Sequence, residues 1–117
     1  MPWVNIMTSF DFPQEKQEVI KREVAQALFD VIGKEERSIF VTFCQAFGFY
    51  RGGVSSPDSA IVELKYIGNF SLEQKQELTR RFCRVMEDNL KLDPQKIIMP
   101  VEELVSENWG RRAGNYS

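Results

Sequence analysis

The sequence predicts an α/β (α+β) fold in which a duplicated β-α-β unit forms a four-stranded sheet with two helices on one face. Two observations predict it. Apolar residues follow strand and helix periods in the order strand, helix, strand, strand, helix, strand. A short run of letters from the first helical region also recurs in the second. The chain has 117 residues, 43% hydrophobic and 27% charged, which is typical of a single folded domain.

The first half contains a strand, a long helix and a second strand. Loose alternation of apolar side chains over Trp3 to Phe10 predicts the first strand. After Pro13, which is tolerated in a first helical turn, apolar residues recur at three- and four-residue steps until Gly33 ends the helix. The β-branched and aromatic run from Ser38 to Gln45 predicts a buried strand.

The second half repeats this order after a loop. Residues 48–57 are rich in glycine, serine and proline and predict that loop. Ala60 to Ile67 predicts the next strand. Ser71 and Gln74 have the spacing of a capping box, so they open a second helix, which stops before Pro94.

The chain ends with a last strand, predicted over Lys96 to Met99, and a tail. We therefore expect one domain over residues 1–117. Its two βαβ repeats span about residues 2–47 and 60–101, and residues 102–117 form the tail.

The duplication is also visible in the letters. Lys16 to Val19 reads Lys-Gln-Glu-Val, and Lys75 to Leu78 reads Lys-Gln-Glu-Leu. The same offset carries Arg22 to Arg81. Because matched letters coincide with matched helices, we interpret the chain as an internal repeat.

One face of the predicted sheet lacks cover. Right-handed crossovers place both helices on one face, so Phe40, Thr42 and Cys44, or their alternates, point to the other. A sheet with apolar residues on both faces and helices on one needs further cover. Identical subunits packed around a common axis supply it.

Composition excludes several chemistries and partners. The chain has no histidine, which excludes a serine triad, a Cys/His dyad and a zinc–histidine site. Cys44 and Cys83 lack zinc-ribbon spacing, and we interpret them as buried small hydrophobic residues in a cytoplasmic protein. A net charge of −2 without a basic stripe argues against nucleic acid. No apolar stretch is long enough for a membrane span.

Pro2 directly follows Met1 and offers a base that needs no histidine. Removal of the methionine leaves a secondary amine at the start of the chain. An α-amino group has a reference pKa of about 7.7 to 8.0, and burial or nearby cations lower it, so such an amine is able to act as a neutral base. Proline at this position is also expected by composition in roughly one chain in twenty. With Met1 attached, Pro2 is an amide without a basic nitrogen.

Five features then occur in a specific order. They are Pro2 at the head of the first strand, Gly33-Lys34 after the first helix, Arg51-Gly52-Gly53 in the loop, Tyr66-Ile67-Gly68 at the end of the third strand and Asn108-Trp109-Gly110 in the tail. Over nearly the whole chain this arrangement resembles the tautomerase superfamily, specifically its branch of macrophage migration inhibitory factor and D-dopachrome tautomerase.

The resemblance implies roles for residues at the start of the chain, after the first helix and at the end of the third strand. Pro2 is the catalytic base. Lys34 binds a substrate carboxylate and lowers the proline pKa. The N–H of Ile67 is the second anchor, and the neighbouring Tyr66 also contacts the substrate. Lys34 also has a purely structural interpretation, because cations at helix C-termini complement the helix dipole.

The tail and the last strand carry the rest of the implied site. Trp109 and Tyr116 fall where the tail of family members lines the mouth of the pocket. The resemblance implies that they pack the substrate's aryl group and that Arg111 adds positive charge. The cytokine members carry a tyrosine and an asparagine on the last strand, which they contribute to the neighbouring subunit's site. Ile98 and Pro100 stand at those positions here.

These inferences predict a cytoplasmic homotrimer, a tautomerase-like barrel, that interconverts keto and enol forms of a 2-oxo acid such as phenylpyruvate without metal or cofactor. One alternative is a superfamily hydratase, dehalogenase or decarboxylase acting on small unsaturated or oxo acids. It would use Arg111 and Arg112 with Glu102 or Glu103. The other is a non-catalytic, cytokine-like binding trimer, which the departures on the last strand favour.

Overall fold

Each half of the chain folds as strand, helix and strand. The computed structural model describes residues 1–111 and 114–115. The first half consists of β1 (Trp3–Thr8), α1 (Gln14–Ile32), the short 3₁₀ helix η1 (Glu36–Ser38) and β2 (Phe40–Gln45). The second half consists of β5 (Ala60–Ile67), α2 (Leu72–Leu90), the 3₁₀ helix η2 (Pro94–Lys96), β6 (Ile97–Ile98) and β7 (Val101–Leu104).

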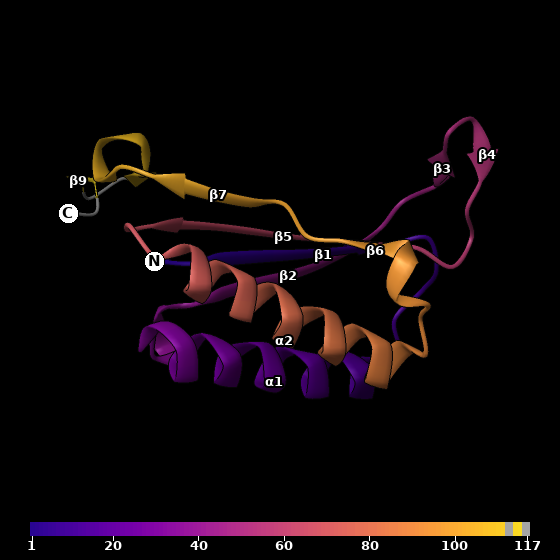
Figure 1. Cartoon of the computed structure of the whole chain (residues 1–117), viewed down its shortest axis with the longest axis horizontal. Coiled ribbons are helices and arrows are strands. Elements are labelled where there is room, and N and C mark those ends of the chain that lie inside the picture. Colours follow the sequence, from indigo (N-terminus) through magenta and orange to yellow (C-terminus); the bar gives the residue numbers. More distant parts are fainter. Residues whose placement is uncertain (112–113, 116–117) are drawn as a thin grey trace.

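The strands form one mixed sheet in the order β2, β1, β5, β6, with β7 pairing β5 further along that strand. β1 is parallel to β2 and antiparallel to β5, so Trp3 lies between Phe40 and Lys65. Figure 1 shows that both helices pack on the same face of this sheet. The prediction of a four-stranded α+β layer with helices on one face is therefore confirmed.

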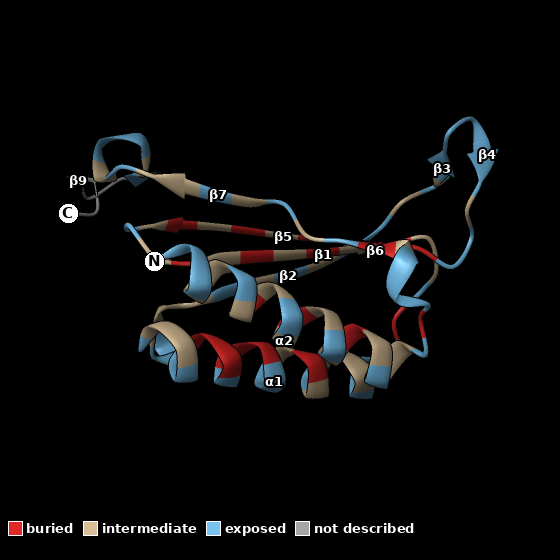
Figure 2. Cartoon of the chain, viewed as in Figure 1, coloured by how far each residue is buried: buried red, intermediate tan, exposed pale blue. Residues whose placement is uncertain are grey.

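The core lies between the sheet and the helices. Every second residue of β1 and β5 is buried, and each helix buries one stripe. Figure 2 shows this buried layer facing inward from strands and helices alike. The fully buried side chains include Val4, Ile6, Ile20, Val24, Leu28, Val62, Leu64, Leu78, Phe82 and Met86. Each large apolar side chain buried in this way contributes about 1.5–3 kcal/mol.

The two helices correspond in the structure, but the offset between them is one residue shorter than the offset that aligns Lys16 with Lys75 in the sequence. Both helices have 19 residues, and Ile20 and Val24 occupy the buried places that Leu78 and Phe82 occupy in α2. Lys16 and Lys75 therefore do not occupy equivalent positions in the two helices, and the predicted alignment of the repeats is wrong by one residue. One residue turns a helix by about 100°, which moves a side chain off the buried face.

The predicted loop over residues 48–57 contains a short hairpin. It pairs β3 (Tyr50–Arg51) with β4 (Val54–Ser55). Gly52 and Gly53 form its turn with φ of 60° and 79°, and two-residue hairpin turns of this kind favour glycine because both residues have positive φ. The sequence analysis predicted a loop here and did not predict the two short strands within it.

The predicted tail is also partly wrong. Only Ile97 and Ile98 of the expected last strand pair with β5, and pairing resumes after Pro100 in β7. Proline lacks the N–H that a ladder needs, so it interrupts the strand without ending it. The chain continues into the 3₁₀ helix η3 (Ser106–Asn108), β8 (Gly110–Arg111) and β9 (Gly114–Asn115).

The sheet face opposite the helices is uncovered in the single chain. Phe40, Thr42 and Cys44 are exposed on it, as the crossover argument predicts. The interpretation of Cys44 as a buried residue is wrong, because it lies on this open face. Among the described residues, no helix has both the length and the apolar character that a membrane crossing requires.

Candidate functional site

Pro2 lies at one end of the sheet, between two strands. Its side chain is buried, and its carbonyl oxygen accepts a hydrogen bond of 3.0 Å from the Phe40 N–H. The antiparallel register pairs Trp3 with Lys65, so Pro2 lies opposite Tyr66 one step further along. Because alternate residues share a face, Pro2 faces the helices together with Val4.

The end of α1 brings Lys34 to the same place. Gly33 adopts φ 69° and donates its N–H to Phe29 at 2.9 Å, while the Lys34 N–H donates to Leu28 at 3.3 Å. This is a helix-ending motif that favours glycine at the left-handed position. Figure 1 shows the end of α1 and the N-terminus at the same end of the molecule.

Lys34 acts electrostatically on the start of the chain. Burial and then the positive charge of Lys34 lower the pKa of the Met1 amine. Met1 is attached here, so the nitrogen of Pro2 is an amide. An amine on Pro2 would lie one residue deeper, where the side chain is buried, and both causes would lower its pKa too.

The end of β5 forms the other wall of this site. Ile67 is half-buried and pairs with Leu104 of β7. Gly68 follows with φ 150°, and a Cβ there would lie 3.0 Å from the Phe70 ring. A side chain at this position would push the Phe70 ring away by a few tenths of an ångström, and the positive φ also favours glycine there.

Tyr66 faces the core and not the solvent. It is fully buried, and its ring packs on Phe70 with centroids 4.7 Å apart. Its hydroxyl lies toward Glu103 without a hydrogen bond of ordinary geometry, and burial followed by the Glu103 charge raises the pKa of Tyr66 to about 12. In the single chain Tyr66 supports the wall behind Pro2 and offers no open surface to a substrate.

Glu103 is held by Lys75, a contact that the sequence analysis missed. The two side chains form an ion pair, each about one third exposed. It joins β7 to the first turn of α2. No spacing in the sequence signals this pair, because it depends on the parallel pairing that sets Tyr66 opposite Glu103.

The tail residues lie beyond the end of β7. Trp109 is half-buried, and its backbone N–H donates to Ser106 at 3.1 Å. Arg111 in β8 is exposed. Figure 1 shows η3 and β9 at the same end of the molecule as the N-terminus. Tyr116 and Arg112 lie outside the described residues.

The structure thus gathers Pro2, Lys34 and Ile67 at one end of the sheet, with the tail beyond β7 at that same end. Ile98 and Pro100 are not brought to this place, because β6 lies toward the opposite end in Figure 1. Three cavities of the chain are lined by other residues and include neither Pro2 nor Lys34. Within the part of the chain that the structure describes, no three metal-ligating side chains come together.

Comparison with known sequence families assigns the chain. The sequence model of the macrophage migration inhibitory factor (MIF) family matches residues 1–115 of this chain. The chain therefore belongs to the MIF family, and the resemblance to the tautomerase superfamily is confirmed. A comparison with curated proteins finds no match.

Solved structures share this fold. A MIF-like protein from Entamoeba histolytica is 23% identical, with a TM-score of 0.81 and 98% of each chain covered. Pt0534, solved after inactivation by 2-oxo-3-pentynoate, is 16% identical, with a TM-score of 0.86 and coverage of 96% of this chain and 93% of that one. A fused 4-OT asymmetric trimer is 16% identical, with a TM-score of 0.86 and coverage of 97% and 94%.

Proposed function

We propose that this protein is a cofactor-independent keto–enol tautomerase that acts on a 2-oxo acid such as phenylpyruvate, with Pro2 as its base. The observation that carries the proposal is the convergence of a buried Pro2 with the Lys34 charge at the start of β1. A dry, cationic environment keeps an amine neutral near pH 7, and a neutral amine is able to take a proton. The proposal requires removal of Met1.

In the reaction, the Pro2 nitrogen takes the proton of the enol hydroxyl. The C–O bond becomes a carbonyl as the electrons of the C=C bond take a proton from the protonated Pro2 at the carbon. The amine is then neutral again, so no other reactant is consumed. Lys34 and the N–H of Ile67 hold the substrate carboxylate, which fixes the reacting carbon beside the amine.

The substrate class has independent support. The neighbour Pt0534 was solved after inactivation by 2-oxo-3-pentynoate, which is itself a 2-oxo acid. Lys34 offers a positive charge that a carboxylate requires, and Trp109 is an aromatic residue of the tail directly after η3. We propose that Trp109, together with Tyr116 and Arg111, closes the mouth around the aryl group.

We propose further that the protein is a homotrimer. Its open sheet face needs cover, and one structural neighbour is a 4-OT trimer. Polar side chains on that face already bond to one another: Trp3 Nε1 donates to Thr42 Oγ1 at 2.9 Å, Thr42 donates to Asn5 Oδ1 at 2.7 Å, and Asn5 Nδ2 donates to Glu63 Oε1 at 3.0 Å. Because these groups are satisfied within the chain, covering them costs less than burying unpaired donors.

The alternative of a hydratase, dehalogenase or decarboxylase is less well supported. That chemistry needs a carboxylate free to activate water. Of the two candidates, Glu103 is held in its ion pair with Lys75, which leaves the exposed Glu102 for this role. Turnover of 3-haloacrylate measured beside phenylpyruvate enol decay separates the two reactions. The non-catalytic binding trimer predicts neither activity.

The proposal is tested by the mass of the intact protein and by one substitution. We expect the mass to correspond to loss of Met1, and we expect Pro2→Ala, with its methionine also removed, to lower kcat/KM for phenylpyruvate at least about a hundredfold. A retained Met1 in active protein, or near wild-type activity in processed Pro2→Ala, contradicts Pro2 as the base.

A further inference from the structure

The duplicated fold has a second place that corresponds to the candidate site. Gly33 and Lys34 follow α1, and Lys91 and Leu92 follow α2 at the same distance from the helix start. By the same correspondence, the start of β5 at Ala60 matches Pro2. A cavity of about 320 Å³ lies at this second place, at the end of α2.

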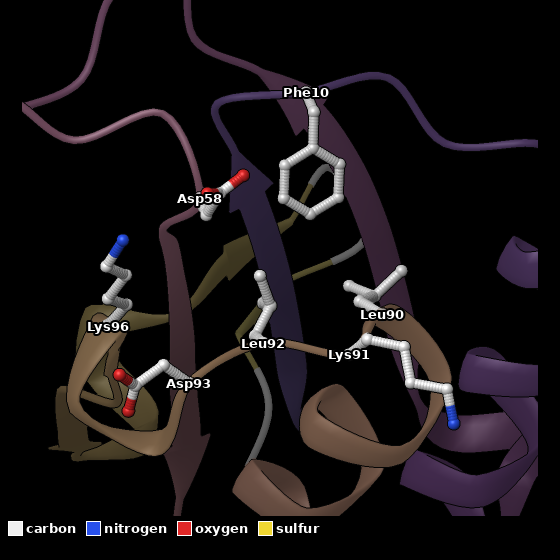
Figure 3. Close-up of a pocket in the computed structure, with 7 residues that line it drawn as sticks. All are labelled: Phe10, Asp58, Leu90, Lys91, Leu92, Asp93 and Lys96. Carbon is white, nitrogen blue, oxygen red and sulfur yellow. The ribbon is translucent and has the colours of Figure 1, made fainter.

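Apolar and charged residues both line this cavity. The apolar ones are Phe10, Leu90 and Leu92, and Figure 3 shows Asp58 and Lys96 together on one side of them. Neither Asp58 nor Lys96 forms an ion pair with another described residue. The two opposite charges are therefore available to a ligand.

The other two charged lining residues have different situations. Asp93 accepts a 3.0 Å hydrogen bond from the Gln95 N–H and caps η2, so its carboxylate is already engaged. Lys91 points its ammonium to the other side of the cavity in Figure 3. It has φ 57° and is, among the described residues, the one non-glycine with positive φ. The first half has Gly33 at this position, so the second half keeps a cation where glycine is favoured.

We propose that this cavity binds an α-amino acid with an apolar or aromatic side chain. An α-amino acid carries its ammonium and carboxylate on one carbon, so both charges must be recognised on one side of a site. Asp58 accepts from the ammonium and Lys96 donates to the carboxylate, while the side chain packs on Phe10 and Leu92. The volume lies within the range of small-molecule sites.

This second site binds its ligand without reaction. Ala60 stands where the first half has Pro2, and its nitrogen is an amide that follows Ser59. No base is therefore present at the corresponding point. The site consequently does not depend on the proposed tautomerase activity, and loss of Met1 does not affect it.

The test is calorimetric titration of the full chain with L-phenylalanine and L-leucine. Two comparison ligands each lack one charge: 3-phenylpropanoate has no ammonium and 2-phenylethylamine has no carboxylate. We expect both to bind at least tenfold more weakly than L-phenylalanine, because hydrogen bonds to charged groups carry most of the recognition. Equal binding of L-phenylalanine and 3-phenylpropanoate overturns the role of Asp58.

Substitutions locate the site. We expect Asp58→Asn and Lys96→Met each to weaken L-phenylalanine binding at least tenfold. Lys21→Met removes a lysine of α1 that pairs with Glu18 and does not line this cavity, so it is the matched control, and we expect it to leave this binding unchanged. The proposal is overturned if no binding is detected at 10 mM ligand, which is roughly the weakest dissociation constant expected of a specific site. Binding that is lost in Lys34→Met but kept in Lys96→Met also overturns it.

Discussion

Replacement of Lys34 by methionine tests the electrostatic basis of the candidate active site. Methionine keeps an unbranched apolar chain and removes the charge, and the Schellman-type helix end is made by backbone groups and Gly33. The fold should therefore persist. Loss of a charged hydrogen bond to the substrate carboxylate costs about 1.5–3 kcal/mol, which corresponds to roughly a tenfold to hundredfold fall in kcat/KM.

The pH profile supplies a second readout of the same change. Burial and then the charge of Lys34 lower the pKa of the amine at the chain start, and the base is active only when it is neutral. Activity therefore rises as the pH rises through the amine pKa. Without Lys34 that pKa increases, so the acidic limb of the kcat/KM profile should move to higher pH. Enol decay of phenylpyruvate, followed by absorbance across pH 5 to 9, roughly centred on the reference amine range, measures both effects.

Two further variants separate charge from general damage. Lys34→Arg keeps the positive charge and should restore most of the activity and the position of the limb. Lys21→Met removes an exposed lysine of α1 that pairs with Glu18 at 2.7 Å, and it should leave both unchanged. If Lys34→Met keeps kcat/KM within about twofold of wild type and the limb does not move, Lys34 is neither the carboxylate anchor nor the cause of the lowered pKa.

Three other expectations concern stability and are measured by chemical denaturation. Lys91→Gly removes the strain of a left-handed side chain at φ 57° and should stabilise the protein by about 1 kcal/mol; a destabilised variant would contradict that strain. Phe82→Ala leaves a cavity at a fully buried position and should lower the unfolding free energy by about 3–5 kcal/mol. Tyr66→Phe removes a buried hydroxyl without an ordinary hydrogen bond and should change stability by less than about 1 kcal/mol; a larger loss would show that the contact with Glu103 is stabilising.

The parts of the fold that local patterns encode could be predicted from the sequence. The strand Ala60–Ile67 has the predicted bounds, and Ser71 and Gln74 form both hydrogen bonds of the predicted capping box, at 3.1 Å and 2.9 Å. Elements that depend on pairing with strands distant in the sequence could not be predicted. β7 forms by pairing with the edge of β5. The local sequence instead predicts a break there, because Pro100 lies immediately before β7.

The candidate site was only partly predictable for the same reason. The resemblance indicated Pro2, Lys34 and Ile67. The sheet register brings the end of β5 beside Pro2, and the end of α1 supplies Lys34. The sequence did not predict that Tyr66 faces the core. That placement follows from the alternation of β5 and from the burial of its partner strand, and neither is visible in the motif that contains Tyr66.

The duplication also explains why the proposed chemistry is expected at one end of the molecule only. Both helices end at a left-handed residue beside the start of a strand, so both ends place a cation close to a strand terminus. Only β1 begins at the end of the chain, and only a chain terminus has a backbone nitrogen with a titratable proton. A repeat of the fold therefore duplicates the helix end and the neighbouring strand start but not the amine. On this argument, Lys34 would serve the proposed reacting site, whereas Lys96 would serve the proposed site that recognises its ligand and leaves it unchanged.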